Sequence, residues 1–218
     1  DPVRKKAEGQ PTGLPPEIDA LFPDTFEDSE LGEIPKGWKC TILSDLVSTQ
    51  YGYTTSADQS IDYVKFLRVM DINKIDWIEW DDVPGCKISD SDLPKYQLEL
   101  GDIVVARMAD PGKAMVYEGK HRSVFASYLV RLRPLTVRNY LFLYNFLKSQ
   151  AYMDYVEAVK GGSVQANMNA RVIVGCRLVL PSLRLQEAFQ TQAVKLRAMM
   201  TENANEIRVI RRLRDSIL

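Results

Sequence analysis

The stretch from Gln186 to Leu218 constrains the fold of this chain more than any other segment. It runs for about 33 residues without Gly or Pro, and it follows directly on the helix-breaking sequence Leu180-Pro181-Ser182. A helix of this length measures roughly 50 Å, which is more than a domain of this size needs to cover its own core. The sequence therefore predicts a globular part followed by one long helix.

Apolar residues in this stretch recur with a seven-residue period, which is typical of a seam that packs against another helix. The seam residues are Phe189, Ala193, Leu196, Met200, Asn203, Ile207, Ile210 and Ile217. The polar exception, Asn203, is of the kind that fixes register and strand number in such a seam, and Arg214 weakens the pattern near the end. A long amphipathic helix folded back on its own domain is the alternative.

Composition excludes several classes of site. Apolar residues make up 45% of the 218, which is enough for one globular domain plus extensions. The segment contains neither an apolar run of 18 residues nor a signal-peptide pattern, and we expect a soluble, cytoplasmic protein. Cys40, Cys86 and Cys176 are too far apart for a C-x-x-C metal knuckle, and His121 is the only histidine. A zinc site or a His-based triad would need unusual partners.

The net charge of -1 conceals two unlike halves. Residues 1–100 carry 10 Lys and Arg against 20 Asp and Glu, whereas residues 101–218 carry 18 against 9. A basic half of this kind can bind phosphate even when the whole chain is nearly neutral. Solvated faces that happen to segregate by charge would give the same count.

The order of patterns predicts an α+β domain with a twisted, mainly antiparallel sheet, followed by the long helix. Residues 1–35 are rich in Pro and acidic side chains and are predicted to be a linker; residues 36–182 form the domain and residues 183–218 the helix. Buried or alternating strands are expected over 63–70, 75–80, 103–106, 114–117, 124–132 and 177–180. Helices are expected over 139–150 and 152–160.

Three polar segments are candidates for contacts with a nucleic acid. They are the loop that starts at Gln50, the hairpin tip 118–122, and the extended segment 163–169, in which alternate polar residues share a face. Each has a plain alternative: an ordinary turn, a solvated tip, or an internal polar brace. The candidate residues are Gln50, Tyr53, Thr54, Thr55, Arg107, Lys113, Lys120, His121, Arg122, Lys160, Ser163, Gln165, Asn167 and Asn169.

Four stretches occur together in an order that resembles one family. They are Gly32-Glu33-Ile34-Pro35-Lys36-Gly37-Trp38, then Leu98-Glu99-Leu100-Gly101-Asp102-Ile103-Val104, then the segment from Gly161 to Asn169, and then Leu180-Pro181-Ser182-Leu183 leading into a Gln-bearing helix. In this order they resemble the DNA specificity subunit of type I restriction-modification systems. The resemblance covers nearly the whole chain.

The resemblance implies a recognition role without catalysis or a cofactor. Family members have two target-recognition domains, each followed by a long helix, and the two helices pair antiparallel as a spacer. The expected partners are double-stranded DNA, the modification (methyltransferase) subunits along the helix, and indirectly the motor-nuclease restriction subunit. With one domain and one helix, the chain is expected to be the C-terminal half of such a subunit. A natural half-length subunit that pairs with itself is the alternative.

Two other functions remain open at this stage. Asp110, Glu118 and Lys120 stand in the order of a metal-dependent nuclease, in which carboxylates hold Mg²⁺ and the lysine assists at the phosphate. A protein-only scaffold, with the helix in a coiled coil, would need no DNA contact at all. Neither an N-P-P-Y/F motif nor a glycine-rich cofactor loop is present for a methyltransferase. The residues that read bases are expected to differ between relatives, so the target sequence is not predicted.

Overall fold

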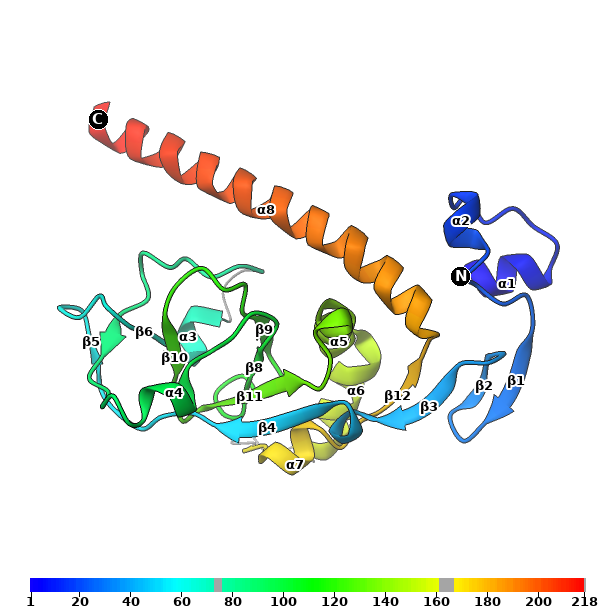
Figure 1. Ribbon diagram of the computed structural model, residues 1–218, viewed down its shortest axis with the longest axis horizontal. Coiled ribbons are helices and arrows are strands. Elements are labelled where there is room, and N and C mark those ends of the chain that lie inside the picture. Colours follow the sequence, from blue (N-terminus) through cyan, green and yellow to red (C-terminus); the bar gives the residue numbers. More distant parts are fainter. Residues whose placement is uncertain (73–75, 161–166, 218) are drawn as a thin grey trace.

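The computed structural model describes residues 1–72, 76–160 and 167–217. It confirms the predicted α+β fold with a long C-terminal helix (Figure 1). The helices are α1 (Pro2–Ala7), α2 (Pro16–Asp19), η1 (Leu43–Asp45), α3 (Val69–Ile72), α4 (Leu93–Tyr96), η2 (Val137–Asn139), α5 (Tyr140–Leu147), α6 (Gln150–Lys160), α7 (Ala170–Ile173) and α8 (Leu183–Ile217). The strands are β1 (Phe26–Ser29), β2 (Gly32–Pro35), β3 (Lys39–Ile42), β4 (Val47–Tyr51), β5 (Ala57–Asp58), β6 (Lys65–Leu67), β7 (Gly85–Cys86), β8 (Ile103–Ala106), β9 (Ala114–Val116), β10 (Ser123–Phe125), β11 (Leu129–Pro134) and β12 (Arg177–Leu180).

The centre of the domain is an antiparallel sheet with the strand order β4-β11-β8-β9. Its strand β8 is buried along its whole length, as the apolar run 103–106 predicted. Because successive side chains in a strand point to opposite faces, Ile103 and Val105 join the core under α5 and α6. Val104 and Ala106 join a second core on the other face, around Trp80. Cores on both faces hold β8 firmly.

The other strands form smaller sheets around this centre. The order β10-β6-β7-β5 forms a second sheet, in which β10 runs parallel to β6 and the remaining pairs are antiparallel. β12 pairs antiparallel with β3, so the strand before α8 lies beside the first strand of the domain. The hairpin β1-β2 precedes it.

Several predicted elements need correction. The expected strand 124–132 is two strands in different sheets, because the Leu129 N–H donates to the Ala126 carbonyl and closes a turn between them. The expected strand 63–70 contains only β6 and then turns into α3. Residues 76–80 are not a strand, and residue 75 lies outside the described residues. Helices α5 and α6 and the strand β12 agree with prediction.

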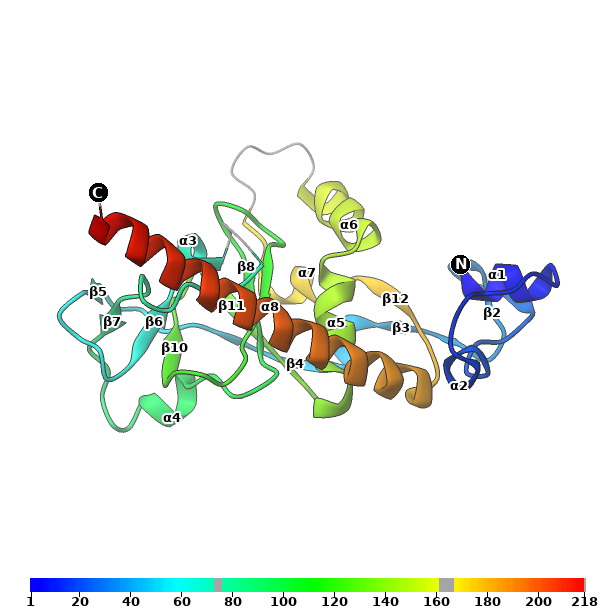
Figure 2. The same cartoon turned by 90° about the horizontal axis from the view of Figure 1, so that it is seen from above.

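The segment 1–35 contains α1, α2 and the β1-β2 hairpin. Val3 is buried, and Lys6 Nζ donates to the carbonyls of Asp19 and Phe22 at 2.9 and 2.8 Å. These bonds tie α1 to α2, which lie together at one end of the molecule (Figure 2). The assignment of this segment as a linker stays a prediction.

Helix α8 is 35 residues long and lies back across its own domain (Figures 1 and 2). Gln186 is buried; its Oε1 accepts from Asn139 Nδ2 at 2.8 Å and its Nε2 donates to the Pro181 carbonyl at 2.7 Å. One turn on, Gln190 Oε1 accepts from the Leu141 N–H at 2.9 Å, where the first turn of α5 has no intrahelical acceptor. The glutamines thus fix the start of α8 to η2 and α5.

Most of the predicted seam residues are exposed, on a face of α8 other than the one that Gln186 and Gln190 turn toward the domain. Leu196, Ile210 and Ile217 are 61%, 65% and 81% exposed. Ala193 instead packs against the core of its own domain, and the Phe189 ring meets that of Phe142 edge-on at 6.3 Å. The structure therefore shows the alternative considered from the sequence, a helix folded back on its domain, and α8 still exposes an apolar stripe; pairing of that stripe with another helix stays a prediction. Within the described residues, no helix is both long and apolar enough to cross a membrane.

Candidate nucleic-acid interface

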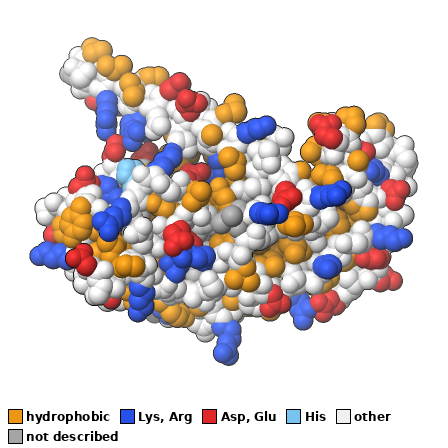
Figure 3. All heavy atoms as spheres, viewed as in Figure 1, with side chains coloured by type: hydrophobic (Ala, Val, Ile, Leu, Met, Phe, Trp, Pro, Cys, Tyr) orange, Lys and Arg blue, Asp and Glu red, His pale blue; other side chains and the backbone are white. Residues whose placement is uncertain are grey.

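Most of the predicted contact residues that the structure describes lie in two places on opposite sides of the central sheet. One group is near β4 and α7, and the other is on the β9–β10 hairpin beneath α8 (Figure 1). On the face shown in Figure 3, basic side chains are interspersed with acidic and apolar ones. The excess of positive charge in residues 101–218 is thus not matched by a uniform basic surface on that face.

Arg107 stands at the end of β8 and is held by residues from two other segments. Its guanidinium carbon is 4.8 Å from the centroid of the Tyr51 ring. Its Nε and Nη2 donate to Asn167 Oδ1 at 3.2 and 3.0 Å. The Tyr51 hydroxyl accepts from the Ala170 N–H at 2.9 Å, at the first turn of α7. We call Tyr51, Arg107 and Asn167 the Arg107 cluster.

The backbone around this cluster is also fixed. The Met168 N–H donates to the Arg107 carbonyl at 2.9 Å, and the Arg107 N–H donates to the Tyr128 carbonyl at 3.0 Å. Asn169 caps α7, since its Oδ1 accepts from the Val172 N–H at 2.9 Å. The Asn169 side chain therefore braces the backbone of its own protein, which is one of the two roles considered from the sequence. Ser163 and Gln165 lie outside the described residues.

The turn after β8 depends on a glycine. Gly112 has a φ of +90°, and a Cβ at this position would lie 2.8 Å from Val156 Cγ2. Ala109 in the same turn also has a positive φ, of 64°. These conformations bring the chain back so that the Ala106 N–H donates to the Lys113 carbonyl at 2.8 Å. The turn leaves Arg107 and Lys113, both half-buried, at the base of an exposed tip.

The loop that starts at Gln50 is only partly free for a ligand. Gln50 Nε2 donates to the Lys95 carbonyl at 3.1 Å, and its Oε1 accepts from Arg131. The Tyr53 ring lies 5.0 Å from that of Tyr96, tilted by 53°. Thr54 is exposed and Thr55 is half-buried. The side chains of Gln50 and Tyr53 therefore make contacts within the protein.

The hairpin residues Lys120, His121 and Arg122 are exposed at the tip between β9 and β10. The His121 ring is 4.8 Å from the Trp80 ring, and its carbonyl accepts from the Tyr117 hydroxyl. Desolvation beside these aromatics lowers the pKa of His121, and the nearby positive charge of Lys65 adds to the effect. His121 therefore favours its neutral form more than a free histidine does.

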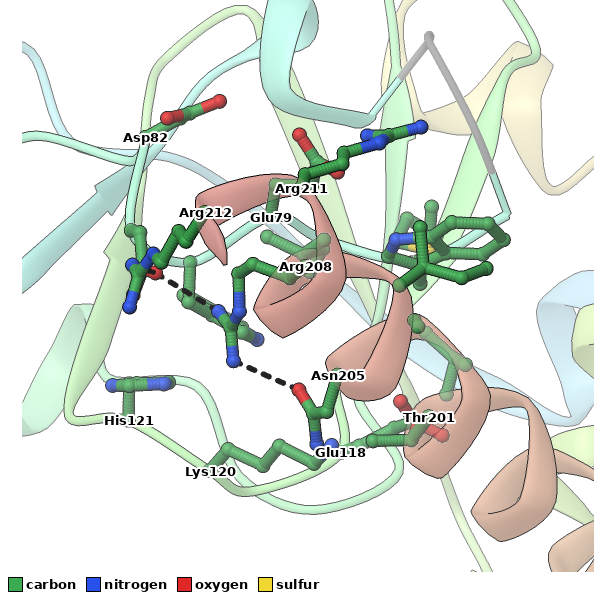
Figure 4. A pocket seen from close by; sticks show the side chains of 18 residues that line it. Glu79, Asp82, Glu118, Lys120, His121, Thr201, Asn205, Arg208, Arg211 and Arg212 are labelled. Carbon is green, nitrogen blue, oxygen red and sulfur yellow. Dashed lines mark hydrogen bonds and ion pairs between the residues drawn. The ribbon is translucent and has the colours of Figure 1, made fainter. Parts of the chain in front are cut away.

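A cavity of about 580 Å³ separates this hairpin from the second half of α8 (Figure 4). Arg208 and Arg212 of α8 both donate to Asp81 Oδ2, at 2.9 and 2.8 Å, across the cavity. Nearer the start of α8, Arg197 Nε donates to Glu118 Oε1 at 2.7 Å. The hairpin therefore faces the basic side of α8, which is a less favourable setting for DNA than the open tip expected from the sequence.

The remaining candidates lie apart from one another. Lys160 Nζ pairs with Glu157 at 2.7 Å on α6. The three residues of the nuclease order are not grouped as a metal site: Glu118 is bonded to Arg197, while Asp110 is on the exposed turn after β8. Over residues 1–72, 76–160 and 167–217, no cluster of three His, Cys, Asp or Glu is arranged to hold a metal ion.

Tyr51 is the residue that the list of candidates omitted. It contacts Arg107 across 56 positions of sequence, and only the register of β4, β11 and β8 brings the two together. Alternation along the strand 47–51 could have placed Tyr51 on a definite face. It could not have given its partner.

Known proteins resemble this chain in sequence and in fold. No family model matches the chain. Two proteins of Methanocaldococcus jannaschii are similar: the putative type I restriction enzyme MjaX specificity subunit, 25% identical over 184 residues, and the type I restriction enzyme MjaVIII specificity subunit, 26% identical over 181. Each alignment covers 75% of this chain and 40% of the relative. The chain thus spans less than half the length of these relatives.

Solved structures share the fold. A chain from a study of complex assembly and conformational transition of the type I R-M system aligns with a TM-score of 0.55 at 16% identity, over 94% of this chain and 47% of that one. The HsdS subunit of Thermoanaerobacter tengcongensis gives 0.53 at 16%, over 85% and 43%. The type I S subunit of M. genitalium gives 0.60 at 13%, over 83% and 44%. The resemblance to type I specificity subunits, drawn from the four sequence stretches, is confirmed.

Proposed function

We propose that the chain is one recognition module, with its spacer helix, of a type I restriction-modification specificity subunit. It reads one half of a bipartite site in double-stranded DNA and has no catalytic site of its own. The observation that carries this proposal is the share of each relative's length that this chain matches. The part of this chain that aligns covers 40% of each curated relative and 43–47% of the solved chains cited above. A subunit built from two such units suits a site with two halves.

The DNA-facing side in this proposal is the region of β4, α7 and the turn after β8. It holds the Arg107 cluster together with exposed Thr54. Polar side chains held on strand ends can reach base edges, while neighbouring Lys and Arg neutralise phosphates. If about six phosphates are neutralised, the slope of log affinity against log salt is roughly -5 for duplex DNA.

Helix α8 serves assembly in this proposal. Its exposed apolar stripe, which includes Leu196, Ile210 and Ile217, pairs with the helix of a second recognition half or of a second copy. Methyltransferase subunits dock along the paired helices in the cytoplasm, and the restriction motor-nuclease subunit joins through them. The stripe supports pairing because apolar side chains of this size exposed in a row favour burial against a partner.

The proposal is tested by selection from a random duplex library. This chain would be assembled with the modification subunits and a second recognition half, and the bound DNA sequenced. We expect a split motif in which one half changes when residues 36–182 are exchanged for the corresponding domain of a relative. As a control, exchange of the recognition domain in the second half of the complex should leave the motif half read by this chain unchanged. An assembled complex that enriches no motif would contradict the proposal.

A protein-only scaffold is the second candidate, and the exposed stripe of α8 is the observation that favours it. In that case the domain binds another protein and contributes no DNA contact. The two functions differ in salt dependence: a recognition module loses affinity for duplex steeply between 50 and 200 mM salt. Assembly with the modification subunits but no salt-sensitive DNA binding would favour the scaffold.

A further inference from the structure

We infer that Arg107 reads a guanine in the major groove of the half-site, and that Asn167 and Tyr51 hold it in position to do so. The inference rests on the proposed function, since it presumes that this side of the domain meets DNA. It goes further by assigning a base and a reading residue. Guanine is the base that presents two acceptors, O6 and N7, to a single arginine fork.

The first support comes from which nitrogens of the Arg107 guanidinium already donate hydrogen bonds within the protein. Asn167 Oδ1 accepts from Nε at 3.2 Å and from Nη2 at 3.0 Å, so it occupies one side of the planar guanidinium. The outer edge consists of Nη1 and the second hydrogen of Nη2. Within the described part of the chain, no acceptor is bonded to Nη1. That edge has the two parallel donors that match O6 and N7 of guanine.

The second support is charge. Elsewhere in the chain the guanidinium groups of Arg133, Arg197 and Arg208 bond carboxylates. Arg107 is held instead by a neutral amide and by the face of the Tyr51 ring, 4.8 Å away. A neutral partner orients the fork, and among the residues that the structure describes no carboxylate is bonded to it. The arrangement is therefore suited to an electronegative ligand that remains to be bound.

The third support is rigidity. Arg107 follows β8, which is buried on both faces, and the Met168 N–H and the Tyr128 carbonyl bond its backbone. The Tyr51 ring is fixed in turn by the Ala170 N–H at 2.9 Å. Base readout needs a donor pair held in one geometry, because a displaced fork cannot meet both acceptors. A phosphate contact would need no such support, since a flexible lysine serves as well.

The test is library selection by the assembled complex described above, which carries either the unsubstituted chain or one of four variants: Arg107→Lys, Arg107→Ala, Asn167→Ala and, as the matched control, Arg171→Ala. Arg171 is exposed on α7 and carries the same charge in the same region. We expect the unsubstituted chain to select one guanine that Arg107→Lys selects roughly 10- to 100-fold less strongly. Asn167→Ala should weaken the same preference, whereas Arg171→Ala should keep it.

Salt dependence separates base readout from phosphate binding. Arg107→Lys keeps the charge, so the salt slope should stay unchanged while the guanine preference falls. If Arg107 instead contacts a phosphate, Arg107→Ala will weaken all sequences equally, reduce the slope by about 1 and keep the base preferences, which would overturn the inference. A motif whose positions are all independent of Arg107 would overturn it too, yet leave the proposed function standing. A pool without any motif would overturn both.

Discussion

Replacing Asp102 by alanine should destabilise the domain far more than replacing its exposed neighbour Glu99. Asp102 is 1% exposed and precedes β8. Its Oδ1 accepts from Arg133 Nε at 2.7 Å, and its Oδ2 accepts from Arg133 Nη2 and from the Glu99 N–H, both at 2.8 Å. These hydrogen bonds raise the pKa of Arg133. The carboxylate thus links the start of the central strand to the end of β11.

The expected loss follows from burial. Removing one partner of a buried ion pair costs about 3–5 kcal/mol, because the other charge stays behind without compensation. Arg133 is 31% exposed and keeps Glu99 at 2.9 Å, so the lower limit, about 3 kcal/mol, applies to Asp102→Ala. In a protein of this size that corresponds to a fall in Tm of roughly 6–12 °C. Glu99→Ala breaks an exposed pair on the same arginine and should cost less than about 1 kcal/mol.

Urea unfolding followed by circular dichroism measures both variants. The midpoint for Asp102→Ala should fall while the m-value stays the same, which indicates lost stability with an unchanged folded state. Equal losses for Asp102→Ala and Glu99→Ala would refute the reasoning, because burial would then make no difference. Gly101 precedes Asp102 with a φ of +89°, in the turn where the Asp102 N–H donates to the Glu99 carbonyl at 2.9 Å.

Two further predictions concern thiols and helix docking. Burial raises the pKa of the Cys86 thiol to about 11, so its thiolate is scarce at pH 8. Cys86 should therefore react with a disulfide reagent much more slowly than half-exposed Cys40, and its reaction should accelerate as the pH rises toward 11. In urea, where the chain is unfolded, Cys86 should react at the rate of an exposed thiol. Asp81→Asn weakens both ion pairs to α8 and should speed amide hydrogen exchange over 204–217, whereas Asp82→Asn, at an exposed neighbour, should not. Equal exchange in both variants would argue against the docking role of Asp81.

Local patterns were sufficient to predict the elements whose cause is local. The run 103–106 is apolar throughout because both faces of β8 are covered, and the absence of Gly and Pro after residue 183 permits one uninterrupted α8. The break in 124–132 was missed, because every residue there is compatible with a strand. Only the separate partners of β10 and β11 require the turn between them.

The candidate site could be predicted only in part, because its geometry is long-range. Arg107 and Asn167 were both chosen from the sequence for their side-chain chemistry. Their bond joins positions 60 residues apart, and no pattern in either segment indicates it. Lys120 was chosen by the same reasoning, but the fold places it in the lining of the cavity beside α8. Residue type can thus indicate what could bind DNA, whereas the sheet register decides which side chains meet.

The two faces of α8 explain how one helix can serve both its domain and a partner. Successive residues of a helix point about 100° apart, so Arg197, which bonds Glu118, and Leu196, which is exposed, face different ways. Contacts to the domain are made by glutamine and arginine together with Ala193 and Phe189, whereas Leu196, Ile210 and Ile217 are exposed. Pairing through those exposed residues therefore does not require α8 to leave its domain. Under the proposed function, bonds within one chain set the angle between the recognition domain and the spacer, and helix pairing sets only the distance between two such units.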